Sequence, residues 1–227
     1  MTQTQKFTLI AAARNEGPFL LEWIAYHRMI GFRDIVIYVD DSIDGSPDLL
    51  GALQDAQVIT CIDNARTDGS QHKGHRARAY MAAQELAQVR DADWVLVLDI
   101  DEFACIKTGD GKVADLLAAL PEADAVTLTW RLFGNAGAVR YKDAPVTAQF
   151  TRCAPEVIHW PWRAVMFKTL YRNDGTYRKC GVHRPRDIRS AAQLDSFRWY
   201  DCEGRELGKA FKTKRLFSNY GQPNGRL

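Results

Sequence analysis

The sequence is poor in cysteine, carries no strong charge of either sign and lacks a long apolar run. Its five cysteines are odd in number, widely spaced and form no CxxC pair, which argues against a disulfide framework or a zinc ribbon and fits a reducing compartment. A net charge of +2 gives no support for nucleic acid as a partner. No apolar run approaches the ~20 residues that span a bilayer. Residues 1–6 hold no signal-peptide core, so we expect a cytoplasmic protein with no transmembrane segment and at most peripheral contact with a membrane.

The composition is that of a soluble globular enzyme. With 227 residues, 46% of them apolar and 26% charged, the chain can bury one substantial core. No linker divides it, so residues 1–227 are predicted to form a single domain. Basic residues gather in the second half, Lys168 among them. They fit either a local anionic partner or a solvated face.

Strands and helices alternate in the first half of the sequence. Apolar runs bounded by turn residues predict strands, and helical spacing with Pro18 and Pro47 at starting positions predicts helices. Ser46 is expected to be an N-cap. The predicted strands are 7–13, 35–39, 57–62 and 94–98, and the predicted helices 18–30, 46–53 and 74–89. This alternation indicates an α/β fold whose mainly parallel sheet is flanked by helices.

The second half is less regular. Strands are predicted at 125–130 and 165–171. Between them, residues 131–162 are rich in glycine, proline and aromatic residues and show no convincing helix. A loop of that length inside a compact domain is usually functional or mobile.

The most informative segment runs from Val95 to Phe103. Four apolar residues form a strand, and Asp99, Asp101 and Glu102 follow at once. In an extended chain, side chains at i and i+2 point the same way, and two carboxylates so close repel unless a cation or a proton intervenes. A divalent metal with phosphate ligands is one solution, and a strand end with solvated acids is the other.

Polar residues also follow the other predicted strands of this half. These residues are 14–16, 40–41 and 63–64. Together with Asp99 and Asp101, they lie at the ends of successive predicted strands. In open parallel sheets, ligands bind beyond the carboxyl ends of the strands. The pattern therefore predicts a binding site along one rim of the sheet.

Four motifs in this order resemble the GT-A-fold nucleotide-sugar glycosyltransferases of the family-2 type, in particular a bacterial subgroup with ARNE, DDSxDGS and LDxDEF. The matching segments are Ala13–Glu16, Asp40–Ser46, Lys73–Arg78 and Leu98–Phe103. The resemblance covers about the first 105 residues and implies a Rossmann-like, nucleotide-sugar-binding half at 1–105. Residues 106–227 would then form an irregular half on the acceptor side.

The resemblance also implies roles for individual residues. Asp101 would bind a divalent metal, Mn²⁺ or Mg²⁺, with Asp99 and His183 as further ligands, and imidazole slightly favours Mn²⁺. Gly181 would permit the close turn that brings His183 back to the site. The residues expected to contact the nucleotide-sugar donor are Ala13, Arg14, Asn15, Glu16, Asp40, Asp41, Arg76 and Asp99.

The implied reaction moves a sugar to a hydroxyl of a glycan or glycolipid acceptor, as in bacterial surface polysaccharide or glycolipid synthesis. Family-2 enzymes invert the anomeric carbon, which calls for a general base. The usual later Glu-Asp pair is missing, and Asp143 and Glu156 are the candidates. Trp160, Trp162 and Phe133 fit either stacking on an acceptor sugar or packing.

Other interpretations stay open at this point. A phosphatase of the haloacid-dehalogenase type also carries DxD after a strand, but normally after the first strand. A nucleotide- or carbohydrate-binding protein without catalysis would explain the missing base motif. His27 and His159 are expected to be packing residues.

Overall fold

A computed structural model describes residues 5–64, 74–155 and 166–213 of the chain. Up to β5, each strand is separated from the next by one or two helices. Strands are β1 (Phe7–Ala13), β2 (Asp34–Val39), β3 (Thr60–Asp63), β4 (Trp94–Val97), β5 (Ala125–Thr129), β6 (Phe167–Arg172), β7 (Tyr177–Lys179), β8 (Arg186–Ile188) and β9 (Trp199–Asp201). Helices are α1 (Gly17–Met29), α2 (Ser46–Asp55), α3 (His75–Ala83), α4 (Ala87–Arg90), α5 (Val113–Ala119), α6 (Val146–Gln149), α7 (Ala191–Ser196) and α8 (Lys209–Thr213).

Seven strands form one sheet in the order β3-β2-β1-β4-β6-β5-β9. β1 pairs in parallel with β2 and with β4, and β2 pairs in parallel with β3. β6 runs antiparallel to both β4 and β5, whereas β9 returns to a parallel pairing with β5. The predicted α/β fold with a mainly parallel sheet is confirmed, and the reversed strand β6 joins its two halves.

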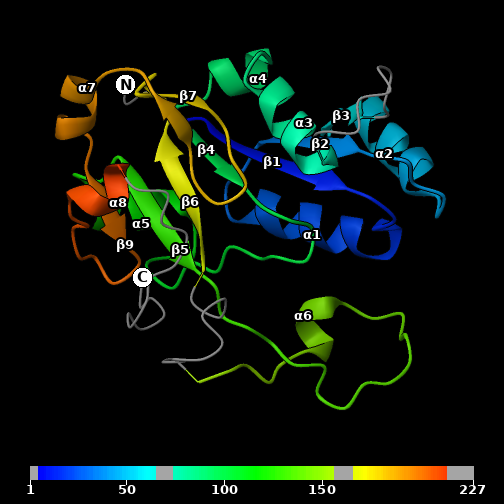
Figure 1. The fold of residues 1–227 in the computed structure, drawn as a ribbon. Helices are drawn as coiled ribbons and strands as arrows, with labels where there is room; N and C mark the ends of the chain where they lie inside the picture. Colours follow the sequence, from blue (N-terminus) through cyan, green and yellow to red (C-terminus); the bar gives the residue numbers. More distant parts are fainter. Residues whose placement is uncertain (1–4, 65–73, 156–165, 214–227) are drawn as a thin grey trace.

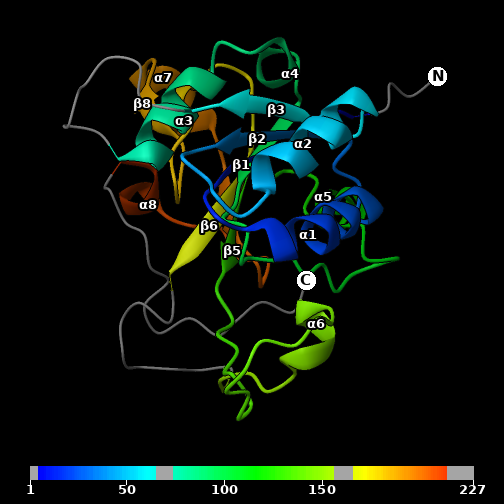
Figure 2. The same ribbon diagram turned by 90° about the vertical axis from the view of Figure 1, so that its right-hand side faces the viewer.

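Helices cover both faces of this sheet, which gives three layers (Figures 1 and 2). Alternate residues of β1 belong to different cores: Leu9 and Ala11 pack with α1, α2 and α5, while Ile10 packs with α3 and α4. A strand sends successive side chains to opposite faces, and a strand buried on both faces is apolar throughout. That explains why residues 7–13 are all buried.

Three local predictions differ from the structure. The helix expected at 74–89 is broken after Ala83, where Leu86 is extended and Gln84 binds Cys180 N with its side-chain oxygen at 3.1 Å. Gly45, in left-handed conformation, occupies the N-cap of α2, so Ser46 is its first helical residue. β3 begins at Thr60, since Gln57 has positive φ.

Residues 131–155 leave the body of the molecule as a projecting arm (Figures 1 and 2). The predicted irregular segment lies here, but it holds one short helix, α6. A bridge between Phe133 and Cys153 closes the base of the arm. Within the described residues, no helix is long and apolar enough to cross a membrane.

Candidate functional site

The carboxyl ends of β1 to β4 lie at one edge of the sheet because these four strands are parallel. At these ends Arg14, Asp41 and Asp63 are exposed, while Asp99 is buried. The prediction that these four residues share one rim is confirmed. Ligands in open α/β sheets usually bind at this edge, so the polar groups here lie where a ligand is expected.

Hydrogen bonds join the first two loops of this rim. Asn15 N donates to Ser42 Oγ at 3.0 Å, and Asn15 Oδ1 accepts from Ile43 N at 2.8 Å. Asn15 and Asp41 both have positive φ, 56° and 34°, a backbone region that non-glycine residues enter rarely and that gathers at functional sites. The amide of Asn15 thus shapes the loop.

Asp44 ties the same loops to two helices. Its carboxylate accepts from Gly17 N at 2.9 Å and from Ser46 N at 3.1 Å. These groups lie in the first turns of α1 and α2, where backbone N–H groups lack helical partners. The hydrogen bond from the Ser46 hydroxyl lowers the pKa of Asp44, so the cap stays ionised.

Asp40, predicted to hold the donor, is buried against a cation. Arg78 lies 2.9 Å from Asp40 Oδ1 and donates to the Asn64 carbonyl at 2.8 Å. This arrangement gives Asp40 a role in fixing α3 to the rim. Asp41, next to it, presents its carboxylate to solvent.

The centre of the rim is a buried charge cluster built on Lys168 of β6. Its ammonium lies 3.0 Å from Asp99 Oδ2 and 3.1 Å from Glu102 Oε2, and the Lys168 side chain is only 1% exposed. Glu102 also accepts from Asp99 N at 2.9 Å. Arg76, half-exposed in the first turn of α3, lies 3.3 Å from Asp99 Oδ1.

Burial raises the pKa of Glu102 to about 7, against the opposing charge of Lys168. Burial and then the charge of Asp101 raise the pKa of Glu16, while Arg76 lowers it. The electrostatic coupling places Glu16, Arg76 and Asp101 in one neighbourhood, as the motif order predicts.

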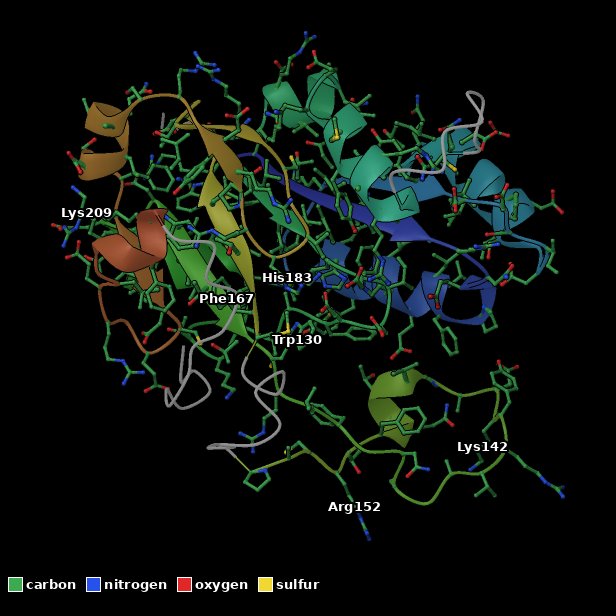
Figure 3. All side chains as sticks on the ribbon, viewed as in Figure 1. Trp130, Lys142, Arg152, Phe167, His183 and Lys209 are labelled. Atoms are coloured by element: carbon green, nitrogen blue, oxygen red, sulfur yellow. The ribbon has the colours of Figure 1, made fainter. Side chains whose placement is uncertain are left out.

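His183 reaches this neighbourhood from the far end of the sequence. Its Nδ1 hydrogen-bonds the Phe167 carbonyl at 3.0 Å, and its ring lies 5.7 Å from that of Trp130 (Figure 3). Burial and then the charge of Lys168 lower the pKa of His183, while Asp99 raises it. A Cβ on Gly181 would collide with the Arg184 carbonyl oxygen, so the close turn predicted there is confirmed.

The rim fits a divalent cation in part. Asp99 Oδ1 is buried and has no hydrogen-bond partner in the described structure, and Asp101 is exposed beside Glu16. Against this, Lys168 and Arg76 already neutralise Asp99. No group of three metal-ligating side chains occurs in the part of the chain that the structure describes. The metal set of Asp99, Asp101 and His183 therefore stays a prediction.

Of the two candidate bases, the structure describes only Asp143, and it does not bring this residue to the rim. Asp143 is exposed on the arm, where it accepts from Tyr141 at 3.4 Å, and its neighbour Lys142 lies well away from His183 (Figure 3). Glu156, His159, Trp160 and Trp162 lie outside the described residues. His27 is fully buried, which confirms its packing role.

The sequence did not single out Lys168 or Arg78 as site residues. The pattern held one indication for Lys168: it shares its strand with Phe167 and Leu170, and a lysine survives burial only with acidic partners. Those acidic partners lie almost 70 residues earlier in the sequence, so the residue pattern within β6 could not identify them.

The model of glycosyltransferase family 92 matches residues 14–207, which include the whole rim. The chain belongs to glycosyltransferase family 92. This corrects the expected family-2 assignment and upholds the broader prediction of a glycosyltransferase. It also removes the phosphatase alternative, since the matched family is one of glycosyltransferases.

Two curated relatives are plant members of family 92. One, from Oryza sativa subsp. japonica, is 29% identical over 148 residues, which are 63% of this chain and 24% of the relative. The other, from Ricinus communis, is 32% identical over 101 residues, or 42% of this chain and 16% of the relative. The chain thus matches about a quarter or less of the length of these proteins.

Among solved structures, the chain is similar to Staphylococcus aureus TarS. TarS 1–349 has a TM-score of 0.43 at 17% identity, covering 85% of this chain and 54% of TarS. The complex of TarS 1–349 with UDP has a TM-score of 0.46 at 16% identity, covering 74% and 47%. Similarity at this level carries no statement about the ligand of this chain.

Proposed function

We propose that this domain transfers a sugar from a nucleoside diphosphate sugar to an acceptor hydroxyl. The observation that carries the proposal is the rim of β1–β4 in a family 92 chain, where exposed Asp41 and half-exposed Arg76 flank the buried Asp99 cluster. An ionised carboxylate accepts from base N–H and ribose O–H groups. A guanidinium binds the anionic diphosphate in bidentate geometry.

The predicted donor-site residues fall into two groups: exposed residues that would contact the donor and residues that would hold the loops in place. Asp41 would hold the base or ribose, and Arg76 the diphosphate at the start of α3, where free N–H groups also favour an anion. Arg14 and Glu16 would line the floor between them, and Ala13, which is fully buried, would support that floor from below. Asn15 and Asp40, which are engaged in the loops, would act by fixing this geometry.

A divalent metal, Mn²⁺ or Mg²⁺, would be held by Asp101, with Asp99 and His183 beside it. When bound, it neutralises the negative charge that grows on the leaving diphosphate. The backbone carbonyl at His183 Nδ1 supports this assignment, because metal-ligating histidines usually donate their other ring N–H to such a group.

In the transfer itself, the acceptor oxygen forms a bond to the anomeric carbon as the bond to the diphosphate oxygen breaks. Inversion requires a base for the acceptor proton, and Asp143 and Glu156 remain the candidates. The acceptor is a glycan or glycolipid, as in the assembly of surface polysaccharides. Product configuration, read by NMR, tests inversion.

The donor assignment is tested by thermal shift against a panel of nucleoside diphosphates and their sugars, with and without Mn²⁺. Ligands that bind only the folded state stabilise it by mass action and so raise the melting temperature. At a ligand concentration a hundredfold above Kd, the free energy of unfolding rises by ~2.7 kcal/mol. We expect one nucleotide class to stabilise the protein. A flat response to the whole panel would overturn the donor-site proposal.

The metal role is tested by Asp101→Ala, with Asp91→Ala as matched control. Both acids are exposed, but Asp91 precedes β4 and Asp101 follows it. Calorimetry should show metal-dependent nucleotide binding lost in the first variant and kept in the second. Equal affinity in both variants with Mn²⁺ present would remove Asp101 from the metal site.

A binding protein without catalysis is the second candidate. The exposed position of Asp143 on the arm favours it, since that acid is not at the rim. Chromatography with a labelled donor detects both the release of free sugar and its transfer to an acceptor. Either reaction distinguishes an enzyme from a binding protein. Donor binding with neither reaction would favour the binder.

A further inference from the structure

The arm at residues 131–155 is an ordered projection. At its base, Gly134 N donates to Arg152 O at 3.0 Å and Ala154 N to Leu132 O at 2.8 Å. A turn at Asn135 is closed by Ala138 N at 2.8 Å. These bonds restrain the base of the arm, which lowers the entropy that binding a partner would cost.

Glu22 of α1 fastens the far part of the arm to the body. Its carboxylate accepts from Val146 N at 2.6 Å, from Thr147 N at 3.0 Å and from the Thr147 hydroxyl at 2.6 Å. These are the first N–H groups of α6, which a helix cannot satisfy itself. The body thus holds the arm out from the molecule in a fixed direction.

The arm exposes apolar side chains that a folded domain would normally bury. Val139 is 90% exposed, Tyr141 67%, Phe133 57% and Leu132 42%. Such groups gathered on one segment mark an interaction surface rather than scattered surface residues.

Basic residues alternate with these apolar ones. In the order Val139-Arg140-Tyr141-Lys142 each apolar side chain is followed by a cation, and Arg152 is exposed on the segment that returns from α6. Residues 131–155 hold Arg131, Arg140, Lys142 and Arg152 against Asp143, so their net charge is 4 − 1 = +3. In the described part of the chain, no salt bridge reaches Arg140, Lys142 or Arg152.

We propose that this arm docks the domain on an anionic lipid bilayer. Cations attract an anionic surface, Tyr prefers the boundary of a bilayer, and aliphatic groups gain by entering it. Two copies of the arm would repel each other, each at +3. A nucleic-acid backbone would leave Val139 and Leu132 without a partner. The inference goes beyond the proposed function and does not depend on it.

Docking through the arm would set the rim close to the lipid surface. Trp130, the residue before the arm, contacts His183, whereas Lys142 lies well away from His183 (Figure 3). The arm therefore connects the edge of the candidate site directly to the docking surface. An acceptor carried by a lipid would be presented within reach of that edge.

Vesicle flotation tests the proposal. The protein should float with vesicles of phosphatidylcholine and phosphatidylglycerol, stay behind with phosphatidylcholine alone, and be released by salt. Each basic residue at such a surface strengthens binding about fivefold, so Arg140→Glu with Lys142→Glu should weaken it at least about 25-fold. Val139→Ser with Tyr141→Ser should weaken it at unchanged charge.

The matched control is Arg90→Glu with Arg178→Glu, which changes the net charge equally. Both residues are exposed, on α4 and β7, at the end of the molecule opposite the arm (Figure 1). The control should keep most of the flotation. Absence of wild-type flotation, equal loss in the control, or a change from dimer to monomer in the arm variants during sedimentation would overturn the proposal. Nucleotide thermal shift on the same variants reports the donor site separately.

Discussion

Lys168 is the residue on which the charge balance of the rim depends. Replacing it with methionine leaves Glu102 without its cation and Asp99 with half-exposed Arg76 alone, and breaking a buried ion pair in this way costs about 3–5 kcal/mol. Urea denaturation of Lys168→Met should show a loss of that size at neutral pH. Adding Glu102→Gln should recover part of it, because one of the two opposed charges is removed. Independent, additive effects of the two substitutions would contradict the cluster.

His27 makes stability depend on pH. Its Nδ1 bonds the Trp23 carbonyl at 2.8 Å and its Nε2 accepts from Ala104 N at 3.3 Å, so the neutral ring fits. Burial lowers the pKa of His27 from 6.5 to about 4. The unfolded chain therefore binds more protons between these values, and the free energy of unfolding should fall by about 3 kcal/mol as pH drops from 6.5 to 4. In denaturation series, His27→Gln should flatten this slope; an unchanged slope would assign it to other groups.

At the scale of single elements, Glu22 controls α6. Glu22→Ala removes the acceptor for Val146 N and Thr147 N, and loss of a helix cap costs ~1 kcal/mol, or about fivefold in local opening. Hydrogen exchange at Thr147 and Phe150 should accelerate accordingly, while exchange in β1 stays unchanged. Glu22→Gln keeps one acceptor oxygen, so its exchange rates should lie between those of the wild type and Glu22→Ala. Equal protection in all three proteins would mean that α6 is held by other contacts.

The elements differ in how far the sequence predicts them. β1, β2 and β4 follow from buried apolar runs, and α1 from Pro18 and helical spacing, since all these signals are local. β9 is three residues long and exists through pairing with β5, more than 70 residues earlier. The same holds for the site: strand-end acids were visible in the motifs, whereas Lys168 acquires its role only when β6 pairs with β4.

For the whole molecule, the single sheet predicts a single unfolding transition. β6, from the second half of the chain, pairs with β4 from the first, and both cores extend across this junction. Far-ultraviolet dichroism and tryptophan fluorescence should therefore give coincident thermal curves, as expected for one cooperative domain at 1–227. Two separated transitions would divide the chain near residue 105 instead.

The pairing of Thr129 with Phe167 affects which parts of the sequence can change without disturbing the sheet. Opposed residues of an antiparallel pair are about 5 Å apart, so the chain departs for the arm and returns at nearly the same point of the sheet. The entropy of closing such a loop grows only slowly with its length. An insertion or replacement between these two residues would therefore leave the strands, the buried lysine and the rim in place. If the arm docks the domain as proposed, exchanging this single continuous stretch of sequence would change the surface that the domain meets and leave the sheet unaltered.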